Sequence, residues 1–182
     1  MFGMMECMSN MPDDELLDLV DENDEVIGTI LRSDYSLLLE KKHGYIRAVE
    51  MFIENNEGKF WIPTRTADKK IAPNGLDFSM GGHVESGEGY TESALREIEE
   101  ELNLKIDSSK LEFIKKFEPK GIPYFRCLYI YRSNESPEYN PDDFTGAEWL
   151  SPEEIIQKIN SGVPAKTSLR ETIESILSER IL

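Results

Sequence analysis

Short segments rich in apolar residues alternate with polar stretches along the chain, an arrangement that predicts β-strands joined by turns and loops. The segments with this pattern are 16–20, 26–31, 47–53, 59–65, 111–117, 124–132 and 147–150. The polar stretches 21–25 and 55–58 separate the first and second pairs, so each pair is expected to form a hairpin. Two longer polar stretches, 67–77 and 133–143, contain Pro, Asn or Gly and predict loops.

Three further segments are expected to form amphipathic helices, in which apolar residues recur about every 3.6 positions. The first lies in the stretch 82–104, where a glycine turn leads into it, and its core-facing stripe is Tyr90, Ala94, Ile98 and Leu102. A second begins at Ser151, where Pro152 and Glu154 complete the signature of a capping box. Ser168 and Glu171 repeat that signal at a third. An apolar stripe, expected to pack in the core, follows there: Leu169, Ile173, Ile176, Leu177 and Ile181.

Strands and helices interleave without an internal repeat or a break in composition. This order predicts an α+β domain in which a mixed β-sheet lies between helices on both faces, an α/β/α arrangement. We expect one domain over residues 13–182, preceded by a flexible tail at 1–12. The tail contains five methionines and lacks the basic and apolar regions of a signal peptide.

The composition narrows the class of partner. Hydrophobic residues make up 39% and charged residues 31% of the 182 positions, as in a globular protein. The net charge of −16 argues against nucleic acid or an anionic membrane surface as the main partner. Cys7 and Cys127 suggest neither a disulfide framework nor a zinc site, and no apolar run reaches the ~18 residues that span a bilayer. A cytoplasmic protein is expected.

Three glutamates on the first predicted helix share one face. Glu97, Glu100 and Glu101 occupy positions i, i+3 and i+4, which lie side by side on a helix. Like charges at this spacing cost about 0.2–0.5 kcal/mol per pair. A divalent cation turns this cost into a gain, because hard cations bind clustered carboxylate oxygens. The spacing therefore predicts a metal site.

The same stretch resembles the Nudix box, G-x5-E-x7-R-E-U-x-E-E-x-G-U, where U is a bulky aliphatic residue. The positions that fit are Gly82, Glu88, Arg96, Glu97, Ile98, Glu100, Glu101 and Leu104. Asn103 stands where the pattern has its last glycine. Asparagine is the next best residue in the left-handed conformation that follows a helix end, so we expect the site to be intact. The resemblance implies the Nudix fold and a metal-dependent pyrophosphohydrolase.

By this resemblance, Glu97, Glu100 and Glu101 would be metal ligands and catalytic residues. Glu88 would be a supporting carboxylate ligand, and the backbone carbonyl of Gly81 a further ligand. The cofactor would be Mg²⁺ or Mn²⁺. The implied reaction is hydrolysis of a diphosphate linkage in a nucleoside diphosphate that is joined to another group.

Arg96 would orient the glutamates by ion pairing, as part of the catalytic set. Arg65 and Lys69 are candidates for holding substrate phosphates, because a cation beside the metal would bind the polyphosphate. Lys69 could equally be a solvent-exposed charge. His83 would contact substrate or satisfy a turn. The partner is thus a small-molecule diphosphate; a homodimer is also compatible with the family.

Outer segments resemble the Nudix branch that contains isopentenyl-diphosphate isomerase and its hydrolase relatives. They are 19–32, 47–48, 58–59, 65–73 and 149–154. The isomerase itself is a poor match. It needs a cysteine where this chain has Gly81, a histidine where it has Ile46, and a Glu-x-Glu that the segment 123–127 lacks. His83 does match an isomerase histidine, and Cys127 is better explained as a small buried side chain.

A third alternative is a Nudix fold that senses a nucleotide without cleaving it. Such a protein would be expected to lose one or more box glutamates, and this chain keeps all of them. Two features stay open. Substrate identity would depend on the loops 67–77 and 133–143. The loop carboxylate that assists catalysis is one of four: Glu118, Asp142, Asp143 or Glu148.

Overall fold

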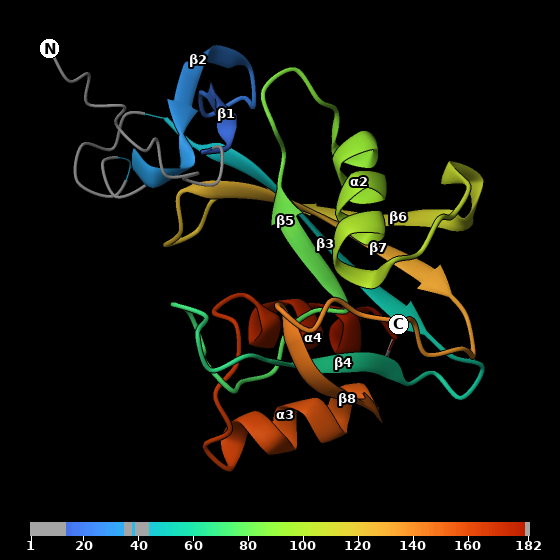
Figure 1. Cartoon of the computed structure of the whole chain (residues 1–182). Helices are drawn as coiled ribbons and strands as arrows, with labels where there is room; N and C mark the ends of the chain where they lie inside the picture. The colour runs from blue at the N-terminus through green and yellow to red at the C-terminus, as the bar shows by residue number, and fades with distance from the viewer. Residues whose placement is uncertain (1–13, 35–37, 39–43, 181–182) are drawn as a thin grey trace, which may run out of the picture.

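The computed structural model describes residues 14–34, 38 and 44–180 (Figure 1). The strands are β1 (Leu16–Val20), β2 (Val26–Leu31), β3 (Ile46–Glu54), β4 (Phe60–Arg65), β5 (Met80–His83), β6 (Leu111–Phe117), β7 (Tyr124–Arg132) and β8 (Phe144–Leu150). The helices are α2 (Tyr90–Leu102), α3 (Pro152–Asn160) and α4 (Leu169–Arg180), with short 3₁₀ turns η1 (Arg32–Asp34) and η2 (Ser108–Lys110). The predicted tail 1–12 and Ile181 lie outside the described residues.

The main sheet is mixed and is built around β3. β3 pairs in parallel with β7 along its whole length and antiparallel with β5, and β6 continues the sheet beyond β7. β4 pairs with β8 antiparallel. The predicted hairpin between β3 and β4 forms only at its turn, through the single pair Glu54↔Phe60.

Ser79 explains why β3 and β4 separate beyond their turn. Its buried hydroxyl accepts a hydrogen bond from the backbone N–H of Ile53 on β3, at 2.8 Å. The same hydroxyl donates to the backbone carbonyl of Trp61 on β4, at 2.5 Å. A side chain thus takes the place of a direct ladder between the two strands, which satisfies backbone groups that burial would otherwise leave unpaired.

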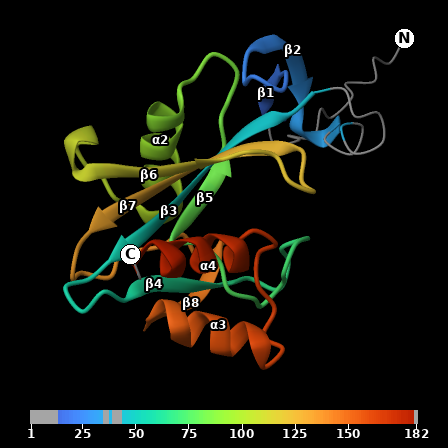
Figure 2. The same cartoon turned by 180° about the vertical axis from the view of Figure 1, so that it is seen from behind.

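Helices cover both faces of the sheet, as the sequence predicts (Figures 1 and 2). Successive residues of a strand point to opposite faces, so β3 contributes to two separate cores. Val49 and Met51 pack with Ile98 and Leu102 of α2, whereas Phe52 packs in a second core. The residues that α3 and α4 bring to this second core are Ile155, Leu169, Ile173 and Ile176. The predicted α+β class with a mixed sheet between helices is confirmed.

The helix ends follow local chemistry in two of the three cases. Asn103 ends α2 in the left-handed conformation expected for it, at φ 49° and ψ 31°. Ser151 and Glu154 form the predicted capping box of α3. The third prediction is wrong in detail: α4 begins as expected, but Ser168 donates its hydroxyl to Glu50 at 2.7 Å. Burial of Glu50 against the helix start explains this, because the carboxylate requires a donor there.

β1 and β2 form a separate two-stranded hairpin beside the main sheet. Asp24 in its turn accepts hydrogen bonds from Arg47 Nε at 2.6 Å, Lys116 Nζ at 2.5 Å and the Tyr90 hydroxyl at 2.9 Å. These partners belong to β3, β6 and α2, so a single carboxylate attaches the hairpin to three elements. Among the described residues, no helix combines the length and apolar character needed to cross a membrane.

Candidate active site

The strand β5 and the helix α2 carry the candidate site. β5 was not predicted, because a four-residue segment with two glycines has no hydrophobic period. Gly82 lies within this strand and not in the glycine turn that leads into the helix: Gly82 pairs with Val49 on β3, and Gly81 pairs with Glu50. The chain turns later, at Gly87, whose φ of +86° suits glycine.

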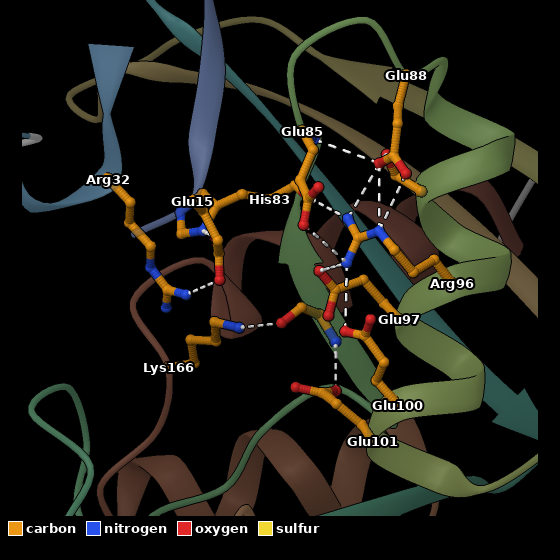
Figure 3. A network of polar contacts seen from close by, with 12 residues as sticks. Glu15, Arg32, His83, Glu85, Glu88, Arg96, Glu97, Glu100, Glu101 and Lys166 are labelled. Carbon is orange, nitrogen blue, oxygen red and sulfur yellow. Dashed lines mark hydrogen bonds and ion pairs between the residues drawn. The ribbon is translucent and has the colours of Figure 1, made fainter. Parts of the chain in front are cut away.

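Arg96 lies at the centre of the acidic cluster (Figure 3). Its Nε is 3.1 Å from Glu88 Oε1, its Nη1 is 2.9 Å from Glu97 Oε1 and 3.3 Å from Glu100 Oε2, and its Nη2 donates to the backbone carbonyl of His83 at 3.1 Å. A planar guanidinium offers five N–H groups in fixed directions. One arginine therefore holds three box glutamates in one place.

Glu97 is the most buried of these glutamates, at 9% exposure. Its carboxylate fills the space beside Gly82, where a Cβ would lie 2.0 Å from the carboxyl carbon. Burial raises the pKa of Glu97 to about 7, although the neighbouring Arg96 opposes the rise. The glycine of the motif is thus needed to let this carboxylate approach the strand.

Glu101 approaches the same strand one turn later. Its Oε2 accepts a hydrogen bond from the backbone N–H of Gly81 at 3.1 Å. Burial raises its pKa to about 8; the ammonium of Lys166 opposes the rise, and the charges of Asp77 and Glu97 add to it. Burial is thus the main cause of the rise, and Lys166 is the cation that counteracts it.

The candidate metal ligands consist only of oxygen donors, which suits a hard divalent cation. Their buried carboxylates with raised pKa values, and the close approach that the glycines permit, also fit such an ion. In the described part of the chain, however, no three acidic, histidine or cysteine side chains converge as a ready metal cage. Arg96 contacts the carboxylates that would otherwise converge.

The N-terminal hairpin reaches the site through His83. Glu15 Oε2 lies 3.6 Å from His83 Nδ1, and Arg32 also pairs with Glu15 (Figure 3). Burial lowers the pKa of His83, while the Glu15 carboxylate opposes that shift. His83 thus lies beside the glutamate cluster with its imidazole held by a residue that precedes β1.

The two predicted phosphate-binding cations are occupied by other partners. Arg65 pairs with Asp77 and donates from Nε to the carbonyl of Ile71 at 2.8 Å. Lys69 pairs with Asp143. Neither cation is seen in contact with the α2 glutamates.

The four candidate loop carboxylates are likewise not gathered at α2. Asp143 binds Lys69, and Glu148 binds Lys158 at 3.0 Å. Asp142 is exposed, and its backbone carbonyl accepts a hydrogen bond from Thr66. Glu118 is exposed just beyond β6.

Sequence reasoning missed two residues that the fold adds to the site, Asp77 and Lys166. Asp77 is 2% exposed and pairs with Arg65. Lys166 Nζ lies 3.5 Å from Asp77 Oδ1 and donates to the Gly81 carbonyl at 3.4 Å. Both lie in segments without a motif, and 85 positions separate Lys166 from Gly81. The one feature of the sequence that could have indicated either residue is the acidic side chain of Asp77, three positions before β5.

The sequence and the fold of this chain are similar to those of known proteins. The family model described as NUDIX domain matches residues 44–171. A Nudix hydrolase of Deinococcus radiodurans is 43% identical over 168 residues, which cover 91% of this chain and 96% of that protein. The crystal structure of DR0079 from Deinococcus radiodurans superposes with a TM-score of 0.79 at 42% identity, over 88% of this chain and 98% of the other.

A more distant structure shares the fold alone. It is a bifunctional NMN adenylyltransferase/ADP ribose pyrophosphatase from Francisella tularensis, complexed with AMP and a manganese ion. The TM-score is 0.60 at 19% identity, over 81% of this chain and 46% of that one.

Proposed function

The chain belongs to the Nudix hydrolase family, and on that basis we propose that it hydrolyses a diphosphate linkage in a nucleoside diphosphate joined to another group. Members of the family act on small-molecule substrates with the help of divalent metal ions. The observation that carries the proposal is the convergence of Glu88, Glu97 and Glu100 on Arg96, with the carboxylate of Glu97 admitted by the missing side chain of Gly82.

The metal would be held by Glu97, Glu100 and Glu101, with Glu88 and the carbonyl of Gly81 as further oxygen donors. We propose Mg²⁺ or Mn²⁺, and the manganese ion in the Francisella tularensis structure supports a cation of this class. When bound, such an ion neutralises charge on the phosphate oxygens and makes a water more acidic.

The protein groups have separate tasks in this proposal. Arg96 fixes the orientation of Glu97 and Glu100 through Nη1. Glu88 is held by both Arg96 and the hydroxyl of Ser93, and although burial raises its pKa, these donors lower it below the ordinary value. A charged Glu88 keeps Arg96 in place, so the catalytic geometry is built before substrate arrives.

A carboxylate beside the site would accept the proton of the attacking water. The acceptor would lie either on α2 or on a loop, where the candidates are Glu118, Asp142, Asp143 and Glu148. Arg65, Lys69 and His83 remain proposed substrate contacts. The first two would have to exchange Asp77 and Asp143 for phosphate oxygens.

We propose that this chain is a hydrolase in the Nudix branch that contains isopentenyl-diphosphate isomerase and its hydrolase relatives. An isomerase would need an acid–base cysteine at position 81, which is glycine. Cys127 does not replace it: its side chain is buried at 3% exposure, and burial raises the pKa of the thiol to about 12. A nucleotide sensor is the remaining alternative, disfavoured because every box carboxylate is retained.

The test is a phosphate-release screen with purified protein and Mg²⁺ or Mn²⁺. The panel contains nucleoside di- and triphosphates, nucleotide sugars, dinucleoside polyphosphates and isoprenoid diphosphates, with Glu101→Gln as the control. We expect turnover of one class, which disappears in the control and on metal removal with EDTA. Tight binding of a panel member without turnover would instead indicate a sensor.

The same proposal includes the cellular setting. We propose that the protein acts in the cytoplasm. Its net charge of −16 argues against nucleic acid or an anionic membrane surface as a partner. A homodimer is the assembly that we propose, and sedimentation of the purified protein would measure it directly.

A further inference from the structure

Lys166 lies next to the proposed metal site although it belongs to the loop between α3 and α4. Its Nζ is 3.4 Å from the Gly81 carbonyl oxygen and 3.5 Å from Asp77 Oδ1 (Figure 3). The side chain is 24% exposed, so it is covered by protein on most sides but keeps an opening to solvent. In the figure it points toward β5 from the side opposite α2.

The backbone around Lys166 is held firmly. The N–H of Lys166 donates to the carbonyl of Leu76 at 2.9 Å, and the N–H of Leu76 donates to the carbonyl of Pro164 at 2.9 Å. Ala165 forms a parallel bridge with Leu76, and Ser168 is bound to Glu50. These backbone contacts fix the position of the Lys166 backbone beside β5, which keeps the ammonium near the site.

The surroundings of Lys166 keep it charged. Burial lowers its pKa, but the charges of Asp77, Glu101 and Glu50 raise it more, so the pKa lies above the ordinary value. The ammonium therefore adds a second positive charge to the site, beside Arg96, which pairs with Glu88, Glu97 and Glu100.

The contacts of Lys166 are too long to satisfy it fully. Charge-assisted N–H···O bonds are about 2.7–2.9 Å long, whereas its two contacts measure 3.4 and 3.5 Å. Asp77 has stronger partners, since Arg65 binds Oδ2 and the N–H of Phe78 donates to Oδ1 at 2.8 Å. An ammonium has three donors, so Lys166 retains capacity for a further acceptor.

We propose that Lys166 binds a phosphate oxygen of the substrate on the side of the site opposite the α2 glutamates. This inference rests on the proposed hydrolysis of a diphosphate linkage. It adds a phosphate-binding cation to Arg65 and Lys69, which are paired with Asp77 and Asp143. A purely structural lysine would instead act as counter-charge to Asp77.

The experiment measures binding of two probes to the full chain by calorimetry: Mn²⁺ alone, and imidodiphosphate in the presence of Mn²⁺. Imidodiphosphate carries NH in place of the bridging oxygen and resists hydrolysis. For Lys166→Met we expect imidodiphosphate affinity to fall about tenfold or more, as for loss of a hydrogen bond to a charged group. Mn²⁺ affinity should stay unchanged or increase, because a positive charge beside the proposed ligands is removed.

Two variants provide controls. Lys115→Met removes one positive charge from β6, where Lys115 binds Glu179 at 2.7 Å, and should leave both affinities unchanged. Lys166→Arg keeps the charge and should recover part of the imidodiphosphate affinity. If Lys166→Met does not fold, Lys166→Gln replaces it.

Each outcome decides the question. Unchanged imidodiphosphate affinity in the folded Lys166 variant overturns the role of Lys166, while wild-type binding and turnover leave the proposed function standing. A parallel loss of Mn²⁺ and imidodiphosphate affinity, together with a lower Tm, assigns Lys166 a structural role only. Absence of Mn²⁺ binding, imidodiphosphate binding and turnover in the wild type removes the proposed function, and this inference with it.

Discussion

The carboxylate of Glu97 occupies the position that a side chain at Gly82 would need: a Cβ there would lie 2.0 Å from its carboxyl carbon. This relationship joins the strand β5 to the helix α2 and explains a motif glycine by contact rather than by backbone conformation. Gly82 has no unusual φ, so an alanine there would be strained only by the carboxylate it meets.

Gly82→Ala is therefore expected to displace Glu97 and weaken the site. We expect turnover of the substrate found in the screen, and Mn²⁺ affinity, to fall about tenfold to a hundredfold, as for residues that support metal ligands. Kinetics and calorimetry measure both. Gly146→Ala is the matched control, since nothing lies within 4 Å of a Cβ at Gly146. Wild-type activity in Gly82→Ala would show that the position of Glu97 is not critical.

Glu100→Gln and Glu101→Gln are each expected to abolish most turnover, by about a hundredfold or more, because loss of a ligand should cost at least as much as loss of its support. The fold should be unaffected or more stable, because removal of one carboxylate reduces repulsion on this face. Steady-state kinetics and thermal unfolding measure the two effects.

Glu99→Gln is the control for this pair, since Glu99 is exposed and pairs with Lys105 on the surface. Unchanged kinetics in Glu100→Gln or Glu101→Gln would contradict the metal assignment at that position. A large loss of stability would mean that the carboxylate has a structural task as well.

Asp24→Asn should loosen the N-terminal hairpin in a pH-dependent way. Burial raises the pKa of Asp24, but hydrogen bonds from Lys116, Arg47 and Tyr90 lower it more, below the ordinary 3.8. A lowered folded-state pKa means that the carboxylate stabilises the fold above pH 3.8 and that this stabilisation is lost as the pH falls through the lowered pKa.

The variant should therefore lose about 1–3 kcal/mol of unfolding free energy at pH 7, as expected for hydrogen bonds to a charged group. The difference from wild type should shrink in acid. Urea unfolding at several pH values tests this, with the exposed Glu22→Gln in the same turn as control. A difference that persists at low pH would contradict the ionic origin of the effect.

Asn103→Gly is expected to be neutral or slightly stabilising without a change in activity. Asn103 has a φ of 49°, where glycine is free of strain. The change also removes a long hydrogen bond from its side chain to the carbonyl of Glu138, at 3.4 Å. Asn103→Ala should instead destabilise by about 1 kcal/mol, because alanine lacks the short polar side chain that lets asparagine adopt the left-handed region. Thermal unfolding ranks the variants, and a large rate change in Asn103→Gly would show that the helix end affects catalysis.

Local sequence patterns were sufficient for most of the fold. Short apolar segments bounded by polar stretches predicted seven of the strands, and the capping box at Ser151 and the left-handed Asn103 were predicted correctly, because these features depend on neighbours a few residues away. β5 escaped prediction because its strand character comes from pairing with β3. The side chains of Ser168 and Glu171 contact Glu50 and Arg126, which lie on distant strands, so the local signal alone did not determine this helix start.

The sequence alone also determined that Glu97, Glu100 and Glu101 share one helix face, since their spacing places the side chains together whatever surrounds them. Only the tertiary structure decided which cations reach that face. Arg65 pairs with Asp77 and not with the glutamates of α2. Lys166, 85 positions after Gly81 in the sequence, lies next to the Gly81 carbonyl in the fold. Helical periodicity acts over a few residues, whereas ion pairs between segments depend on where the whole chain places each charge.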